Sequence, residues 1–343
     1  MFDTADSVPR ADISTVLMEA VGQEKLFIAQ MLLPVYDSVT EVGRYPRFRK
    51  QAGELLRAGR SPTSNAGVVT FNAHTKRGAT GTYNELTRKF EWDAYQTEEY
   101  GLEERVDDVQ ARRMETFFDA EMLTGKFLMN ALMLDYEMEV AAKLNTTSGT
   151  DPNEGLIQTA ATEAYTPANL ATVDFPADMN AIIERLTLLG TNPGEMDVVL
   201  SLTIFNYLRR TQKLQTYVYG FLNVTQGGSQ ITEQMMASAF GLRSCIVAKK
   251  SVDTAIKGLA PNLIPVWGNT NVLVGKFGDG DFMNGGLGRT ICWEHDSPGG
   301  LFTSESYRDE RRRGTMLRIR SNRTLKLIDP TCGQLLQTNW SAT

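Results

Sequence analysis

Histidine is the first residue type to examine for chemistry, because it can act as an acid, a base or a metal ligand near neutral pH. The chain has two histidines, His74 and His295. His295 stands in the run Trp-Glu-His-Asp-Ser, which contains the residue types of a Ser-His-Asp triad. Adjacent residues of a strand point to opposite faces, so His295 and Asp296 would not cooperate as that triad requires. We therefore expect a strand end here and a solvated surface histidine at position 74.

Cysteine and glycine provide no recognised ligand motif. Cys245, Cys292 and Cys332 are widely spaced without a C-x-x-C pair, which predicts neither a zinc site nor a disulfide framework. The glycine-rich run 278–288 lacks the dinucleotide-binding spacing. A calcium loop starting at Asp279 would need glutamate at its twelfth position, where threonine stands. The sequence therefore predicts no catalytic residue, no cofactor and no metal ion.

A basic segment raises the question of nucleic-acid binding. Between residues 44 and 60 there are six basic side chains, interleaved with Tyr45 and Phe48. Basic and aromatic side chains in alternation can bind nucleic acid. The whole chain, however, has a formal net charge of −6, which argues against a dedicated nucleic-acid-binding protein. A solvated surface and charge pairing with a second copy of the chain remain the other interpretations.

A second charged segment lies between residues 308 and 314. Here Asp309 and Glu310 precede Arg311, Arg312 and Arg313. Three consecutive arginines cannot share one face of a strand, so we expect a turn from which they fan outward. Exposed ion pairs contribute little to folding, whereas arginine can hold a carboxylate of another chain with two hydrogen bonds. The sequence thus favours a contact between copies at this turn.

Length and composition describe a chain that can bury a substantial core. It has 343 residues, of which 42% are hydrophobic and 22% are charged, an ordinary composition for a globular protein. The apolar run Leu26–Leu33 is too short to span a bilayer. The first residues carry more acidic than basic side chains, the wrong charge for a signal peptide. We therefore expect a chain that is made and assembled in the cytosol, without a membrane partner.

The expected elements follow a defined order. Residues 1–65 are expected to form an arm with a helix that ends before Pro34. In 66–100, two β-rich segments flank a polar tip that contains glycine, which predicts a projecting hairpin. Residues 161–288 alternate helical and strand patterns and predict an α/β module. The last segment, 289–343, shows strand patterns only.

The clearest expected element is a long helix over residues 108–144. This stretch contains no proline and one glycine, and at 1.5 Å per residue it would be roughly 50 Å long. Asp107 or Asp108 is expected to cap its start. A helix of this length needs an extended surface of the protein to pack against. The side chains expected to face the strands are Phe117, Leu123, Phe127 and Leu132.

Four segments, taken with this order of elements, resemble a known family. They are Tyr100-Gly-Leu-Glu-Glu-Arg-Val-Asp-Asp-Val, Ile264-Pro-Val-Trp-Gly-Asn-Thr-Asn-Val-Leu-Val, Leu287-Gly-Arg-Thr-Ile-Cys-Trp and Ser306-Tyr-Arg-Asp-Glu-Arg-Arg-Arg-Gly-Thr-Met-Leu-Arg-Ile-Arg. The chain resembles the major capsid protein of tailed bacteriophages, whose shell fold also occurs in encapsulins. The resemblance implies an α+β fold with an N-terminal arm (1–65), a projecting β-hairpin called the E-loop (66–100), a P-domain with a long spine helix (101–160), an inserted α/β A-domain (161–288) and C-terminal P-domain strands (289–343).

This resemblance implies a structural protein and no enzyme. Such a protein would assemble through pentamers and hexamers into an icosahedral shell that encloses a viral genome, in the host cytoplasm. The implied partners are further copies of the chain, scaffolding, portal or decoration proteins, and packaged double-stranded DNA in non-specific contact. The expected assembly contacts are Lys76, Arg77, Arg88, Asp309, Glu310, Arg311, Arg312 and Arg313. A hydrolase-type enzyme and a nucleic-acid-binding protein remain the alternatives.

Overall fold

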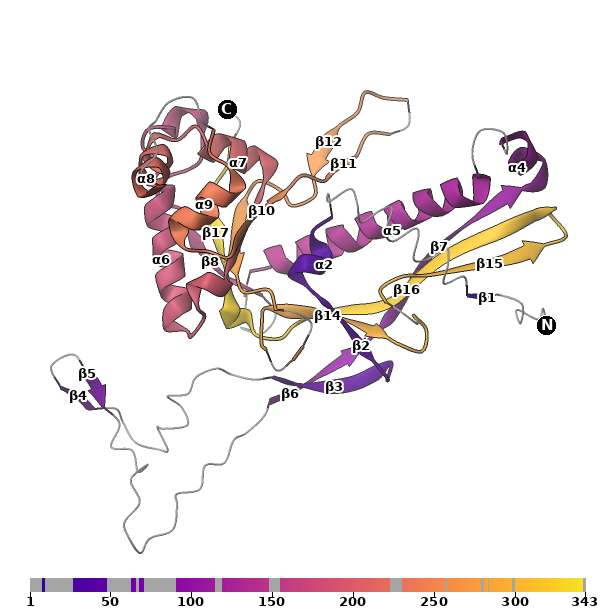
Figure 1. Ribbon diagram of the computed structural model, residues 1–343, viewed down its shortest axis with the longest axis horizontal. Coiled ribbons are helices and arrows are strands. Elements are labelled where there is room, and N and C mark those ends of the chain that lie inside the picture. The colour runs from indigo at the N-terminus through magenta and orange to yellow at the C-terminus, as the bar shows by residue number, and fades with distance from the viewer. Residues whose placement is uncertain are drawn as a thin grey trace, which may run out of the picture.

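Two sheets organise the computed structural model (Figure 1). The described residues are 8–9, 27–47, 63–65, 68–70, 91–114, 119–147, 155–222, 230–256, 258–278, 281–282, 284–297 and 300–341. A six-stranded sheet with a long helix forms an elongated half, and a five-stranded sheet with several shorter helices forms the other half (Figure 1). Buried apolar side chains gather into two main clusters, one around the long helix and one among the shorter helices.

The central strand of the six-stranded sheet is β16 (Gly314–Leu327), which pairs antiparallel with β15, β14 and β7. The other strands are β1 (Val8–Pro9), β2 (Val35–Ser38), β7 (Glu98–Asp107), β14 (Gly288–Trp293) and β15 (Thr303–Asp309). β16 is one long strand, since β7 pairs with it without interruption from Gly314 to Arg323.

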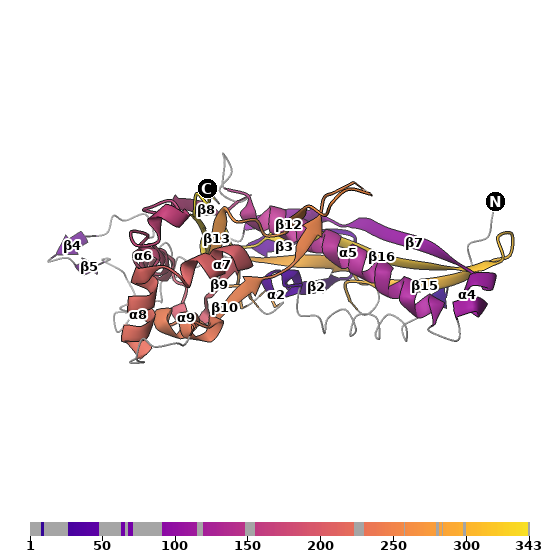
Figure 2. The ribbon, with the colours of Figure 1, turned by 90° about the horizontal axis from the view of Figure 1, so that it is seen from above.

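The long helix is shorter than predicted, because the segment 108–144 contains two helices. These are α4 (Asp108–Met114) and α5 (Ala120–Asn145), and α5 lies along the six-stranded sheet (Figure 2). Asp119 has an extended backbone, and its carboxylate accepts hydrogen bonds of 2.9 and 3.2 Å from the first free N–H groups of α5. The expected cap before α4 is confirmed, since Asp107 accepts a 2.9 Å hydrogen bond from a backbone N–H of its first turn.

The buried face of α5 also differs from the prediction. Leu132 is 3% exposed, as expected, but Phe127 is 64% exposed. Leu123 is half-buried, and Phe117 lies outside the described residues. The apolar side chains that α5 buries recur at helical spacing; they are Leu128, Met129, Leu132, Met133, Tyr136, Val140, Ala141 and Leu144. Phe127 does not belong to this stripe, so the prediction that it packs on the strands is wrong.

The five-stranded sheet has the order β10-β9-β13-β17-β8. Its strands are β8 (Ile157–Ala160), β9 (Asp197–Ser201), β10 (Ser244–Ala248), β13 (Asn271–Gly275) and β17 (Gly333–Gln337). Its helices are α6 (Phe175–Leu188), α7 (Leu202–Leu208), α8 (Gln212–Leu222) and α9 (Glu233–Phe240). The α/β alternation predicted for residues 161–288 is confirmed, because these helices alternate with β9, β10 and β13 along the chain.

The last strand belongs to a different sheet from the one predicted. The sequence grouped all of 289–343 with the strands around β16, whereas β17 lies between β13 and β8. Leu335 lies opposite Leu273 of β13, and Gln334 lies opposite Ile157 of β8. The end of the described chain therefore completes the second sheet. The division of the chain into domains stays a proposal.

The segment predicted as one hairpin, 66–100, does not pair as expected. β6 (Glu91–Gln96) pairs with β3 (Val42–Arg47), and β5 (Val68–Thr70) pairs with β4 (Thr63–Asn65). β3 and β6 therefore flank residues 48–90, and Figure 1 shows β4 and β5 apart from both sheets. The remaining short elements are α2 (Ala29–Leu32), β11 (Ser251–Asp253), β12 (Leu263–Pro265) and the 3-10 helices Pro167–Asn169, Pro193–Glu195 and Pro330–Cys332.

Candidate assembly surfaces

The predicted charged turn forms the tip of the β15–β16 hairpin, at one end of the elongated half (Figure 1). At its base, Arg308 donates two 2.6 Å hydrogen bonds to the carboxylate of Asp108 at the start of α4. Mainly through this hydrogen bonding, Arg308 lowers the pKa of Asp108 below its usual value. Glu310 lies 3.4 Å from Arg308, and Asp309 lies 3.8 Å from Arg312. Both carboxylates of the turn thus have a cationic partner in their own chain.

The outer surface of this turn is basic. Arg311, Arg312 and Arg313 are all exposed, and Arg313 reverses the chain with a left-handed φ of +48°. The sequence analysis treated both signs of charge as available to a second chain. Within the turn Asp309 is paired with Arg312, and Glu310 is paired with Arg308, so a second chain would contact a turn that is already partly paired. That contact stays a prediction.

The other three predicted contact residues, Lys76, Arg77 and Arg88, lie outside the described residues, so their role also stays a prediction. The structure does describe the base of their loop, where β3 and β6 pair from Val42 opposite Gln96 to Arg47 opposite Glu91. These two strands fix both ends of the loop to one place on the body.

The base of the loop is packed as well as paired. The hydroxyl of Tyr45 donates a 2.9 Å hydrogen bond to Asp93, and the hydroxyl of Tyr95 lies 2.5 Å from that of Ser38 at the end of β2. Tyr45 and Tyr95 are also both buried. The loop that carries the predicted contacts is therefore anchored to the edge of the six-stranded sheet.

A projecting element that the sequence analysis missed carries apolar side chains. β11, β12 and the loop that joins them rise from the body (Figure 1). Ile256, Leu259 and Leu263 are 76%, 69% and 65% exposed, and Ile264 is 47% exposed. Large apolar side chains gathered on an exposed tip are typical of a surface that another protein covers. The available signal was the run Leu-Ala-Pro-Asn-Leu-Ile from residue 259, which contains no charged residue.

A buried glutamate of α5 ties distant parts of the chain together. Glu137 is 0% exposed, and its carboxylate accepts hydrogen bonds from the backbone N–H groups of Ala29 (2.8 Å) and Ile28 (3.1 Å) and from the indole of Trp267 (2.6 Å). Burial raises the pKa of Glu137 above its usual value, although these hydrogen bonds oppose the shift. The carboxylate serves α2 as an N-terminal cap, because Ile28 at that position has no side-chain acceptor.

A buried arginine joins the six-stranded sheet to α5. Arg323 of β16 is 1% exposed, and its guanidinium lies 2.8 Å from Glu139 and 3.2 Å from Asp135, both on α5. The same guanidinium lies over the ring of Tyr100 on β7, 4.2 Å from its centre. The elongated half therefore behaves as one framework from which the turn and the loops project.

The residues of the hydrolase alternative do not form a catalytic arrangement. Asp296 forms an ion pair with Arg320 and accepts a 3.2 Å hydrogen bond from Asn322, so its carboxylate is engaged away from a triad. The ring of His295 lies beside that of Trp293, with 5.5 Å between centres. As expected, the run 293–297 lies at a strand end, because β14 ends at Trp293.

The glycine-rich segment between β13 and β14 encloses the side chain of Arg289. Arg289 is 1% exposed and donates 2.7 Å hydrogen bonds to the carbonyl oxygens of Asp281, Gly285 and Gly288. A Cβ atom at Gly278 would lie 2.5 Å from this guanidinium, so the loop needs glycine there to enclose it. The run thus has a structural use for its glycines.

Two kinds of site are absent from the described part of the chain. No group of three or more histidine, cysteine or acidic residues there is arranged to hold a metal ion. Within the same residues, no helix combines the length and apolar character needed to cross a bilayer.

Comparison of sequences identifies no relative: no protein-family model matches the chain, and no curated protein matches it. Comparison of structures finds matches over nearly its whole length. A phage-related protein from Bordetella bronchiseptica is 19% identical, with a TM-score of 0.65 over 97% of this chain and 98% of that one. The capsid of the cyanophage P-SCSP1u is 14% identical, with a TM-score of 0.51 over 89% of this chain and 86% of that one.

A third match is the SrpI encapsulin complex from Synechococcus elongatus, which is 12% identical, with a TM-score of 0.50 over 100% of this chain and 95% of that one. At these identities the likeness establishes the fold. The chain has the α+β shell fold, shared by phage capsids and encapsulins, that the sequence analysis predicted.

Proposed function

We propose that this chain is a structural shell protein whose copies assemble through pentamers and hexamers into an icosahedral capsid around a viral genome. The observation that carries the proposal is the match of nearly the whole chain to a phage capsid and to a phage-related protein. Because these matches cover 97% and 89% of this chain, they reflect a common architecture and not one shared motif.

The distribution of charge supports contact between identical chains. β7 lies beside β16 and carries four exposed glutamates, Glu98, Glu99, Glu103 and Glu104. Glu103 lies 2.9 Å from Arg318 and Glu99 lies 4.0 Å from Arg320 in the same chain, so Glu98 and Glu104 are the more available of the four. The tip of the β15–β16 hairpin is basic in the same molecule. Opposite charges on different parts of one chain favour a head-to-tail contact, and such contacts close into rings when the rotation between copies allows it.

The exposed apolar side chains support the same proposal. Ile256, Leu259 and Leu263 on the β11–β12 hairpin, Phe127 on α5 and Trp92 on β6 are each more than half exposed. In a shell these surfaces would lie against neighbouring copies, which removes apolar area from water.

The inner surface would contact double-stranded DNA without sequence preference, and scaffolding, portal or decoration proteins would be further partners. Assembly would take place in the host cytoplasm, and the protein would have no catalytic role.

Electron microscopy of the purified protein tests the proposal directly, with native mass measurement on the same sample. We expect closed particles of uniform diameter, with pentamers and hexamers as smaller species. Monomers or dimers alone, at high protein concentration and with any scaffolding protein supplied, would contradict it. A salt series adds a second readout, because charged contacts weaken as ionic strength rises; we expect assembly to need more protein at high salt.

A further inference from the structure

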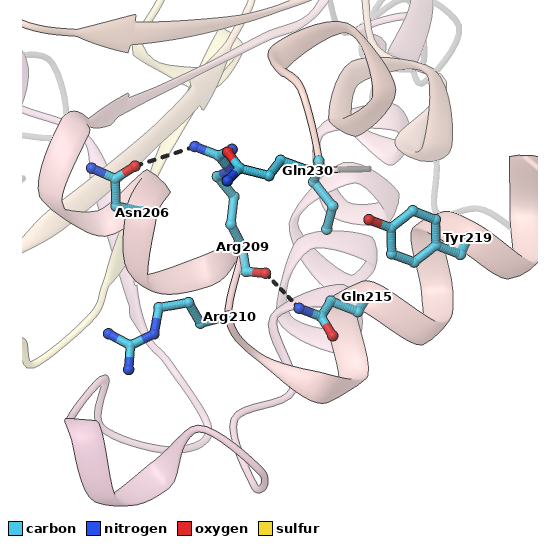
Figure 3. A pocket seen from close by; sticks show the side chains of 7 residues that line it. Asn206, Arg209, Arg210, Gln215, Tyr219 and Gln230 are labelled. Carbon is cyan, nitrogen blue, oxygen red and sulfur yellow. Dashed lines mark hydrogen bonds between the residues drawn. The ribbon is translucent and has the colours of Figure 1, made fainter. Parts of the chain in front are cut away.

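A polar cavity of about 350 Å³ lies in the helical half, where α7 ends, α8 begins and the chain approaches α9 (Figure 3). Its polar lining consists of Asn206, Arg209, Arg210, Gln215, Tyr219 and Gln230. The one apolar lining residue is Ile231, and no carboxylate lines the cavity. Its volume lies at the lower end of the range for small-molecule sites.

Arg209 is held in place by neutral groups. Its guanidinium donates hydrogen bonds to the amide oxygen of Gln230 and, at 3.4 Å, to that of Asn206 (Figure 3). The guanidinium carbon also lies 5.3 Å from the centre of the Phe205 ring. The side-chain amide of Gln215 donates a 2.8 Å hydrogen bond to the carbonyl oxygen of Arg209 (Figure 3). These contacts orient the guanidinium and leave its charge uncompensated.

Arg210 also lines the cavity, with its guanidinium pointing away from that of Arg209 (Figure 3). It is exposed, and among the described residues neither Arg210 nor Arg209 lies within ion-pair distance of a carboxylate. Some other cations in this half are paired: Lys213 binds Asp174 at 2.9 Å, and Lys249 binds Glu233 at 3.1 Å. In a chain with a formal net charge of −6, two adjacent arginines without such a pair at a concave site are available to an anionic ligand.

We propose that this cavity binds a phosphate group. A planar guanidinium presents paired N–H donors that match two phosphate oxygens, and Arg209 is already oriented with its remaining donors unassigned. The amide and hydroxyl groups of the lining can supply further hydrogen bonds. The same hydrogen bonds can be made to a free phosphate compound or to a phosphate of a nucleic-acid backbone. Competition with DNA distinguishes these two ligands. The proposal holds whether or not the chain forms shells.

Isothermal titration of the full-length chain with inorganic phosphate tests the site. We expect saturable binding with a dissociation constant of about 1 mM or lower. Arg209→Gln should weaken it by about tenfold or more, since a hydrogen bond to a charged group is lost, and Arg210→Gln should weaken it less, because it removes a nearby positive charge only. Arg113→Gln is the matched control, because Arg113 is an exposed arginine of α4 far along the chain from this cavity, and it should bind like the wild type.

Competition by a short DNA duplex identifies the source of the phosphate. Displacement of bound phosphate by the duplex would identify a nucleic-acid backbone as the ligand, and failure to displace it would identify a small phosphate compound; both outcomes support a phosphate site. A melting curve for each variant establishes that it is folded. Absence of saturable phosphate binding, or equal binding by the wild type and by folded Arg209→Gln and Arg210→Gln, would overturn the proposal.

Discussion

Glu137 is the residue whose charge state bears most directly on stability. Its carboxylate is buried and its pKa is raised above the usual 4.5, mainly by desolvation. A carboxyl group with a raised pKa binds its proton more tightly in the folded state, so its stabilising effect is greatest at low pH. As the pH rises from 4.5 through the raised pKa, that contribution to the free energy of unfolding is lost.

The expected result is a pH-dependent difference between the wild type and Glu137→Gln. The amide cannot ionise, so the variant should gain stability relative to the wild type as the pH rises through this range. Urea denaturation of the unassembled chain at several pH values measures it, and taking the difference between the two proteins cancels the titration of other groups. A difference that is constant over pH would contradict the raised pKa.

Phe127 and Leu132 form a matched pair on α5 that separates folding from assembly. Leu132 is 3% exposed and Phe127 is 64% exposed. Leu132→Ala should lower the free energy of unfolding by about 2–5 kcal/mol, whereas Phe127→Ala should change it by about 0.5 kcal/mol or less. We expect Phe127→Ala to impair shell formation, because that ring is available to a neighbour. Denaturation curves and particle yield are the two readouts, and a large loss of stability in Phe127→Ala would contradict the observed orientation.

Residue types and local caps could be predicted from sequence better than partners across the fold. The cap at Asp107 follows from its position before a helical pattern, and the structure confirms it. The roles of Glu137 and Arg323 depend on contacts with residues more than 100 positions away, which no local pattern encodes. A signal for Glu137 was present nevertheless, because it is an acidic residue in the middle of an apolar helical band.

At the scale of elements, the β15–β16 turn is the feature best suited to a test. Replacing Arg311, Arg312 and Arg313 together by glutamate should leave the chain folded, because all three are exposed. Closed shells should be lost while isolated pentamers or hexamers remain, since the contact would become repulsive. The triple lysine variant is the control: it keeps the charge and should still close shells. Particles of normal size and stability from the glutamate variant, seen by electron microscopy, would show the turn to be a solvated loop.

The ends of an element could be predicted where a residue in the sequence itself, such as a proline, stops the element. The pattern over 108–144 contains no proline, so nothing in its apolar periodicity marks the break before α5. Asp119 was the available signal, because aspartate is a preferred N-cap, but an aspartate on the polar side of a helix looks the same in sequence. The pairing of β3 with β6 was missed for another reason: strand partners separated by a long loop are decided by tertiary contacts.

For the whole molecule, β17 is the strand on which the second sheet depends. Removing residues 333–343 would separate β8 from β13 and expose the apolar neighbours of Leu335 and Leu336, which are 0% and 1% exposed. We expect the shortened chain to yield little soluble, folded protein, as measured by soluble yield and circular dichroism. Removing only residues 342–343 is the control and should have no effect. A folded chain without β17 would show that the other four strands suffice.

The overall architecture was the most predictable level, because the order of arm, loop, helix, α/β module and strands is itself a long-range pattern. The resemblance predicted the shell fold that the structural matches bear out. It did not predict which sheet β17 joins, because the sequence of a short apolar strand does not specify its partner strands.

The pairing of β8 with β17 also sets a schedule for synthesis. β17 is synthesised about 175 residues after β8, and at about 5–20 residues per second the wait is roughly 10–35 s. Throughout that interval the second sheet lacks an inner strand. A chain that has not yet reached β17 therefore has no finished second sheet to present to a neighbouring copy.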